Sequence, residues 1–152
     1  NLIDDNSIPG VIPPPPTKPT DFYSATVGLT NAFTYNTVAA AVAAGANTIL
    51  ISAIIGNPVV ETTDITVTKD LYIFVQGGWT LGDYNFIIQN TDITITIIGL
   101  SRQESAINLT YTTSAKRMFS YSTNTLNIVF KSITINNSST HAPTITAMKN
   151  TF

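Results

Sequence analysis

The sequence predicts an all-β protein built as a parallel β-helix, a solenoid of about four rungs with an N-terminal capping helix and an extended Pro-rich arm. Three observations favour this fold. Short runs of β-branched and aromatic residues follow one another with Gly, Asn, Asp, Ser or Pro between most of them. Similar apolar triplets recur at an interval of 22 residues. Tight hairpin signals such as Asn-Gly are scarce between the runs, so consecutive strands are not expected to pair as hairpins.

Composition limits the classes of function. The chain has 152 residues, enough for one domain with a real core. Only 11% of the residues are charged, against roughly 25% in an average soluble domain, and the net charge is −2. The few Lys and Arg residues are scattered, so we expect no nucleic-acid partner. There is no cysteine, which excludes disulfides and thiolate chemistry, and no cofactor is expected.

The first twenty residues predict an arm rather than a folded element. Residues 1–20 contain six of the eight prolines. The run Pro13, Pro14, Pro15 and Pro16 favours extended polyproline II and cannot join a helix or a central strand. We expect this arm to tether the chain to protein partners, with a PxxP ligand for an aromatic groove as the alternative. The β-helix domain is expected over residues 21–152.

One short helix is predicted before the strands begin. "TYNTVAAAVAAGA" (34–46) has a narrow apolar stripe, with Thr34 or Asn36 as N-cap and Gly45 as the stop. Residues 38–55 are long enough to be considered as a membrane span. Their alanines and interrupting polar residues favour a helix followed by a strand instead. No membrane span is therefore expected.

The remaining chain consists of candidate strands. They are residues 47–55, 64–68, 71–76, 85–89, 92–99, 105–111, 118–123, 126–137 and 143–148. The triplets that begin at Ile49, Leu71, Ile93 and Leu126 are spaced by 22, 22 and 33 residues. A solenoid with a loop insertion in the third interval, over 100–117, explains these spacings. A β-sandwich is the structural rival, but it leaves the recurrence unexplained.

One stretch carries a resemblance to a known superfamily. Residues 33–78, "FTYNTVAAAVAAGANTILISAIIGNPVVETTDITVTKDLYIFVQGG", resemble the start of a right-handed parallel β-helix of the pectin-lyase-like superfamily. The resemblance implies a right-handed coil whose N-terminal end is capped by the helix. At the other end "PTITAMKNTF" has no cap, so either the natural chain continues or a partner chain closes the bottom. Members with enzymatic activity cleave or de-esterify polysaccharide with paired Asp and Arg or Lys on middle rungs. Those pairs are not found here.

Two aspartates are candidates for a metal site. Asp70 and Asp92 are one predicted period apart and would stack on one edge of the coil. Two stacked carboxylates can hold Ca²⁺, which prefers several oxygen ligands. The alternative is that each Asp closes a turn before its strand.

Some aromatic and cationic residues are candidates for carbohydrate contacts. Trp79 and Tyr84, with neighbouring aromatics, could form a sugar-stacking platform if they point outward; the alternative is core packing. The only arginines, Arg102 and Arg117, lie in the expected insertion. No pair of facing carboxylates suited to glycosidase chemistry is found, so no catalytic residue is assigned and an enzyme is the less favoured interpretation.

These features predict a structural or attachment module of an extracellular or virion assembly. In style, though not in motif, the chain is similar to viral spike, fibre, tail and capsid-associated proteins. The arm and the uncapped C-terminal rung would contact protein partners, or identical copies in a trimer, and a surface glycan is a further candidate partner. The expected location is a virion, the cell surface or the extracellular space. The alternative is the N-terminal part of a polysaccharide-binding or polysaccharide-degrading protein or an adhesin.

Overall fold

The computed structural model describes residues 22–28, 34–113, 117–120, 125–140 and 150–151. The Pro-rich arm and the expected strand at 143–148 lie outside these residues. The elements, in chain order, are β1 (Ala25–Gly28), α1 (Val38–Ala43), β2 (Thr48–Ser52), β3 (Val59–Val60), β4 (Ile65–Val67), β5 (Leu71–Gly82), β6 (Phe86–Ile88), β7 (Ile93–Gly99), β8 (Ser105–Leu109), β9 (Phe119–Ser120), β10 (Leu126–Lys131), β11 (Thr134–Asn137) and β12 (Asn150–Thr151).

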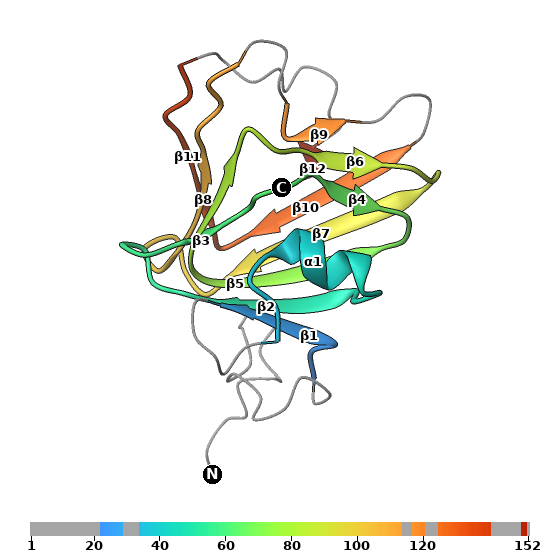
Figure 1. Cartoon of the computed structure of the whole chain (residues 1–152), viewed down its shortest axis with the longest axis horizontal. Helices are drawn as coiled ribbons and strands as arrows, with labels where there is room; N and C mark the ends of the chain where they lie inside the picture. The colour runs from blue at the N-terminus through green and yellow to red at the C-terminus, as the bar shows by residue number, and fades with distance from the viewer. Residues whose placement is uncertain (1–21, 29–33, 114–116, 121–124, 141–149, 152) are drawn as a thin grey trace.

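The strands wind into a parallel solenoid of about four turns with three faces (Figure 1). The first face contains β1, β2, the first half of β5, β7, β10 and β12, in that order. The second face contains β3, the second half of β5, β8 and β11. The third face contains β4, β6 and β9. The predicted all-β solenoid is therefore confirmed, with a single short helix in the described part of the chain.

Strand β5 runs through the corner between the first and second faces without a loop. The bend occurs at Gly77, whose φ of 91° lies in the left-handed region that favours glycine. A Cβ added at Gly77 would lie 2.0 Å from the carbonyl oxygen of Ala53 on the preceding rung. Glycine is thus required at this corner both for its backbone conformation and for the close approach of the neighbouring rung.

The register corrects the predicted period. Ile49 pairs with Ile73, not Leu71, and Leu71 pairs with Ile95, not Ile93. The third interval is as expected, because Ile93 pairs with Leu126. Side chains alternate between the two faces of a strand with a period of two, so a shift by two residues keeps every inward residue inward. The apolar pattern alone therefore allows either register.

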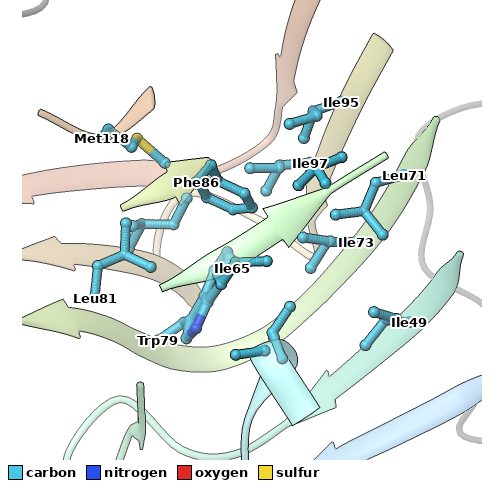
Figure 2. Packing of buried hydrophobic residues seen from close by; sticks show 14 of the residues in the cluster. Ile49, Ile65, Leu71, Ile73, Trp79, Leu81, Phe86, Ile95, Ile97 and Met118 are labelled. Carbon is cyan, nitrogen blue, oxygen red and sulfur yellow. The ribbon is translucent and has the colours of Figure 1, made fainter. Parts of the chain in front are cut away.

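Stacked aliphatic side chains fill the interior. Ile49, Ile73 and Ile97 occupy one column through three successive rungs, and each is fully buried. Figure 2 shows these residues with others of the same cluster, among them Trp79 and Phe86. Each fully buried aliphatic side chain stabilises the fold by about 1.5–3 kcal/mol relative to an exposed one. This interior accounts for the charge-poor runs of the sequence.

Helix α1 is shorter than the predicted 34–46, and its N-cap is Thr37 rather than Thr34 or Asn36. The Thr37 hydroxyl accepts a hydrogen bond from the backbone N–H of Ala40 at 3.1 Å. The helix buries Val38, Ala39 and Ala41 and lies beside β4, the first strand of the third face. Strand β1 precedes the helix and was not predicted from the sequence, nor was β3.

The outer faces also carry contacts between rungs. On the second face Asn136 donates its side-chain amide to the Asn108 side-chain oxygen at 3.2 Å, and Asn108 donates to the Thr80 hydroxyl at 3.2 Å. On the first face Tyr23, Leu50 and Phe74 form a second apolar cluster, separate from the interior. Both sides of the first sheet are therefore packed along part of its length.

The Gly77 corner gives a test of the fold. We expect Gly77→Ala to lower the free energy of unfolding by at least about 2 kcal/mol, because the new Cβ adds a strained positive φ to a clash with the backbone of Ala53. Gly56→Ala is the matched control, since a Cβ there meets nothing within 4 Å; it should change stability by less than about 1 kcal/mol. Urea denaturation followed by circular dichroism measures both. Equal effects of the two substitutions would contradict the assigned bend.

Candidate functional site

The corner between the first and second faces has an uneven surface, and we call it the first corner. Here the rungs alternate between long and short connections. Residues 53–58 and 100–104 form loops, whereas β5 bends directly at Gly77 and β10 reaches β11 through Ser132 and Ile133. Successive rungs stack about 4.8 Å apart. Each short connection therefore lies next to a loop that protrudes further from the coil.

Two hollows lie beside this corner. The first hollow, of about 340 Å³, results from the alternation: it lies over the Gly77 bend between the two loops and is lined by Ala53, Ile54, Ile55, Gln76, Gly77, Leu100, Gln103 and Glu104. The second hollow, of about 290 Å³, is lined by Arg102, Phe130, Ser132, Ile133 and Ile135. Phe130 and Ile133 pack against the interior cluster, so the second hollow belongs to the last described rung and not to the side of the coil. Loop 100–104, which we call the ridge, contributes residues to both hollows.

The first hollow combines apolar and polar groups. Ile54 is 67% exposed and Ile55 is 47% exposed, more than any other isoleucine in the described residues. The side-chain oxygen of Gln76 is buried and has no hydrogen-bond partner in the described part of the chain. A buried polar atom left in that state costs about 1–3 kcal/mol. Such a group is unexpected in a region that serves only as packing.

Hydrogen bonds to neighbouring rungs hold the ridge in place. The backbone N–H of Gly77 donates to the Glu104 carbonyl at 2.9 Å, and the Thr134 hydroxyl donates to the Arg102 carbonyl at 2.7 Å. The Ser105 hydroxyl donates to the Val75 carbonyl and accepts from the Leu100 N–H, both at 2.7 Å. The hollows are therefore formed by the fold itself.

The structure does not bring the predicted sugar-contacting residues together. Trp79 is fully buried in the interior, and its indole N–H donates to Glu61 at 2.9 Å, so it cannot be a surface platform. Tyr84 is half-buried at the corner between the second and third faces, and Arg117 is exposed between β8 and β9. Only Arg102 lies at the first corner. Of the two alternatives for Trp79, core packing describes its position.

The two candidate metal ligands are not stacked in register. With Leu71 opposite Ile95, the Asp70 carboxylate accepts a hydrogen bond from the backbone N–H of Thr94 at 2.8 Å. Asp92 occupies the turn before β7 with a φ of 57°. Asp70 therefore joins two rungs, whereas Asp92 lies in the turn before its strand, as the turn-closing alternative expects. Within the described ranges there is no group of three or more His, Cys, Asp or Glu residues that could hold a metal ion.

Other aspartates join successive rungs in the same way. The Asp64 carboxylate accepts from the backbone N–H of Asn85 at 2.9 Å. The Asp83 carboxylate accepts from the Thr112 N–H at 2.7 Å and from its hydroxyl at 2.6 Å. These acids satisfy backbone donors at the corners, where the strand ladders are interrupted.

Glu61 is the buried acid to which the sequence analysis gave no role. It is 2% exposed. Its carboxylate accepts from the backbone N–H groups of Val38 at 3.1 Å and Ala39 at 2.8 Å, as well as from Trp79. Burial raises the pKa of the Glu61 carboxyl, although the three hydrogen bonds act in the opposite direction. Glu61 thereby joins the first turn of α1 to the interior, and only the tertiary contacts show this role.

Two tyrosines also have shifted ionisation. Burial raises the pKa of Tyr23, and burial raises the pKa of Tyr111 with further contributions from Asp64 and Asp83. The Tyr111 hydroxyl donates to the Tyr84 carbonyl at 3.2 Å. Both groups stay neutral over the ordinary pH range and serve packing and hydrogen bonding.

The fold and the first corner define a parallel β-solenoid with a looped, hollowed edge. The chain matches no family model, no curated protein and no solved structure. Among the residues that the structure describes, no helix has the length and apolar character that crossing a bilayer requires.

The raised pKa of Glu61 predicts a pH-dependent stability difference. The folded state holds the Glu61 proton more tightly than the unfolded state, so this contribution is fully present below the ordinary pKa of about 4.5. It is lost as the pH rises through the folded-state value. The free energy of unfolding should therefore be higher for the wild-type protein than for Glu61→Gln at pH 4. This difference between the two proteins should become smaller as the pH rises toward 8.

Urea denaturation of both proteins between pH 4 and pH 8 measures this difference. The other titrating groups are the same in both proteins, so their contributions cancel when the two free energies are subtracted. A difference that grows with pH would show that the hydrogen bonds outweigh burial and that the pKa is lowered instead. Thr62→Ala, at an exposed residue next to Glu61, serves as the control and should leave the pH profile unchanged.

Proposed function

We propose that this chain is a structural or attachment module of an extracellular or virion assembly. The observation that carries the proposal is the use of its buried polar groups. Glu61 holds helix α1, Ser105 joins two rungs, and Tyr111 bonds to the backbone of Tyr84. Each group stabilises the scaffold through these hydrogen bonds. A stiff stack of rungs is suited to bearing load or displaying loops.

The proposal includes the ends of the coil. Helix α1 would act as a cap that covers the edge strand of the third face, since β4 would otherwise present unpaired backbone groups. The coil would be right-handed, as parallel crossover connections nearly always are. The Pro-rich arm would dock onto other proteins of the assembly, and the last rung would meet a partner or identical copies.

A second candidate function is polysaccharide binding. It is favoured by the first hollow, where the exposed side chains of Ile54 and Ile55 lie beside amide and carboxylate groups. This function needs no catalytic residue in the described part of the chain and is compatible with a structural body.

Cross-linking in the native assembly tests the attachment role. Lys18 places an amine in the arm, while Lys69 and Lys131 lie on the body. An amine-reactive cross-linker should join Lys18 to other proteins of the assembly, as identified by mass spectrometry. Deletion of residues 1–20 should abolish incorporation into the assembly while leaving the circular dichroism spectrum of the coil unchanged.

As a control, Pro13–Pro16 can be replaced by four serines, which keeps the length of the arm but removes its polyproline stiffness. This variant should be incorporated less than wild type. Cross-links of Lys18 confined to its own chain, together with normal incorporation after deletion, would contradict the attachment role.

A further inference from the structure

We propose that the first hollow is a binding site for an arginine side chain of a protein partner. The guanidinium group of that side chain binds Glu104 and Gln76, while its aliphatic stem packs on Ile54 and Ile55. The inference deepens the attachment role and rests on it, because it names the chemistry of a partner. It does not depend on the polysaccharide-binding candidate.

The first hollow contains hydrogen-bond acceptors that have no donor. The side-chain oxygen of Gln76 is buried without a hydrogen-bond partner among the described residues. The Glu104 carboxylate also lines the hollow, and within the described part of the chain it makes no ion pair and accepts no hydrogen bond. Buried polar groups are normally paired. The hollow therefore suits a ligand that donates several hydrogen bonds.

The charge at the hollow favours a cation. Of the described residues that line it, Glu104 is the one charged residue, and none is a lysine, arginine or histidine. Arg102, two residues before Glu104 on the ridge, lines the second hollow instead. The whole chain has a net charge of −2 as well. Local and overall charge are thus both complementary to a basic partner and unfavourable to an anionic one.

The apolar walls select a side chain rather than a small free cation. The exposed side chains of Ile54, Ile55 and Leu100 lie in the hollow beside the acceptors. The stem of an arginine or lysine packs on apolar surface of this kind while its charged head reaches polar groups. A ligand that uses both the walls and the acceptors is therefore a long side chain with a cationic end.

The number of acceptors favours arginine over lysine. A guanidinium group carries five N–H donors in a planar fork, enough for a bidentate pair with the Glu104 carboxylate and a further bond to the Gln76 oxygen. The lysine ammonium group is a compact point charge that does not match a carboxylate in this bidentate way. Arginine is therefore the occupant that satisfies both acceptors at once.

The site requires little rearrangement before binding. The backbone N–H of Gly77 donates to the Glu104 carbonyl at 2.9 Å, and the backbone N–H of Glu104 donates to the Ser101 hydroxyl at 3.1 Å. A preformed site loses less conformational entropy on binding than a loop that must become ordered. The volume of about 340 Å³ lies at the lower end of small-ligand sites, roughly 300–1,000 Å³. This size suits one side chain.

The test uses the full chain and short peptides that differ at one position. The probe is the acetylated pentapeptide amide Gly-Gly-Arg-Gly-Gly, and the comparators carry citrulline, norleucine or lysine in place of the arginine. Citrulline keeps the shape of the arginine side chain but not its charge. Binding is measured by NMR shifts of backbone amides. We expect the arginine peptide to bind with a Kd of about 1 mM, with shifts concentrated in residues 53–55, 76–77 and 100–104.

The comparator peptides separate the contributions to binding. The citrulline and norleucine peptides should bind at least about tenfold more weakly, and the lysine peptide about threefold more weakly. The assignment is overturned if the arginine peptide causes no shifts in the hollow, or if the citrulline peptide binds equally well. Binding of cellohexaose in the hollow without binding of the arginine peptide also overturns it, in favour of the polysaccharide-binding candidate.

Substitutions at the two acceptors locate the guanidinium group. Glu104→Gln should weaken binding of the arginine peptide by about tenfold but leave that of the citrulline peptide unchanged. Gln76→Met should weaken it by about threefold without lowering the melting temperature, since the Gln76 oxygen has no partner in the free protein. Asp92→Asn is the matched control, because it removes one negative charge from an exposed turn before β7. Equal effects of Glu104→Gln and Asp92→Asn would overturn the site.

Incorporation into the native assembly separates this site from the attachment role. Glu104→Gln should be incorporated less than Asp92→Asn, and equal incorporation of the two would overturn the role of the hollow in partner binding. If deletion of residues 1–20 abolishes incorporation but the arginine peptide does not bind, the attachment role stands and the hollow is not its site.

Discussion

The parallel register of the first face is the constraint on which the rest of this structure depends. When Ile49, Ile73 and Ile97 stack in one column, every other residue of these strands points inward and must be apolar. The same stacking places each corner directly beside the corner of the next rung. Gly77 is needed because the neighbouring backbone passes where a side chain would be. Core composition, corner glycines and loop positions thus follow from a single pairing pattern.

Glu61 shows how a charge-poor interior can include an acid. Its carboxylate meets two backbone donors of α1 and the indole of Trp79, so each of its oxygens is satisfied. The first N–H groups of a helix have no partner within the helix itself. A buried carboxylate supplies those partners, and the three hydrogen bonds offset only part of its desolvation, so the pKa of Glu61 stays raised. The Glu61 side chain therefore positions helix α1 and the indole ring of Trp79 relative to strand β3, which ends just before Glu61.

Function is most reasonably sought at the corners, because the faces are occupied by packing. Aromatic residues such as Trp79 and Phe86 are used in the interior. The first corner differs, since its long and short connections alternate from rung to rung and leave a hollow over the Gly77 bend. Exposed isoleucines lie there beside the side-chain oxygen of Gln76, which has no hydrogen-bond partner among the described residues. The features most directly available to a ligand therefore lie on residues that break the regularity of the coil.

The sequence by itself determined the class of fold. Short β-branched runs, recurring apolar triplets and the scarcity of hairpin signals were sufficient to predict a solenoid and most of its strands. It could not determine the register, because a shift by two residues leaves the apolar pattern unchanged. That shift separated Asp70 from Asp92, and the inward direction of Trp79 was equally hidden from local pattern. The first hollow and the role of Glu61 were decided by tertiary structure alone, since both arise from residues that come together only when successive rungs stack.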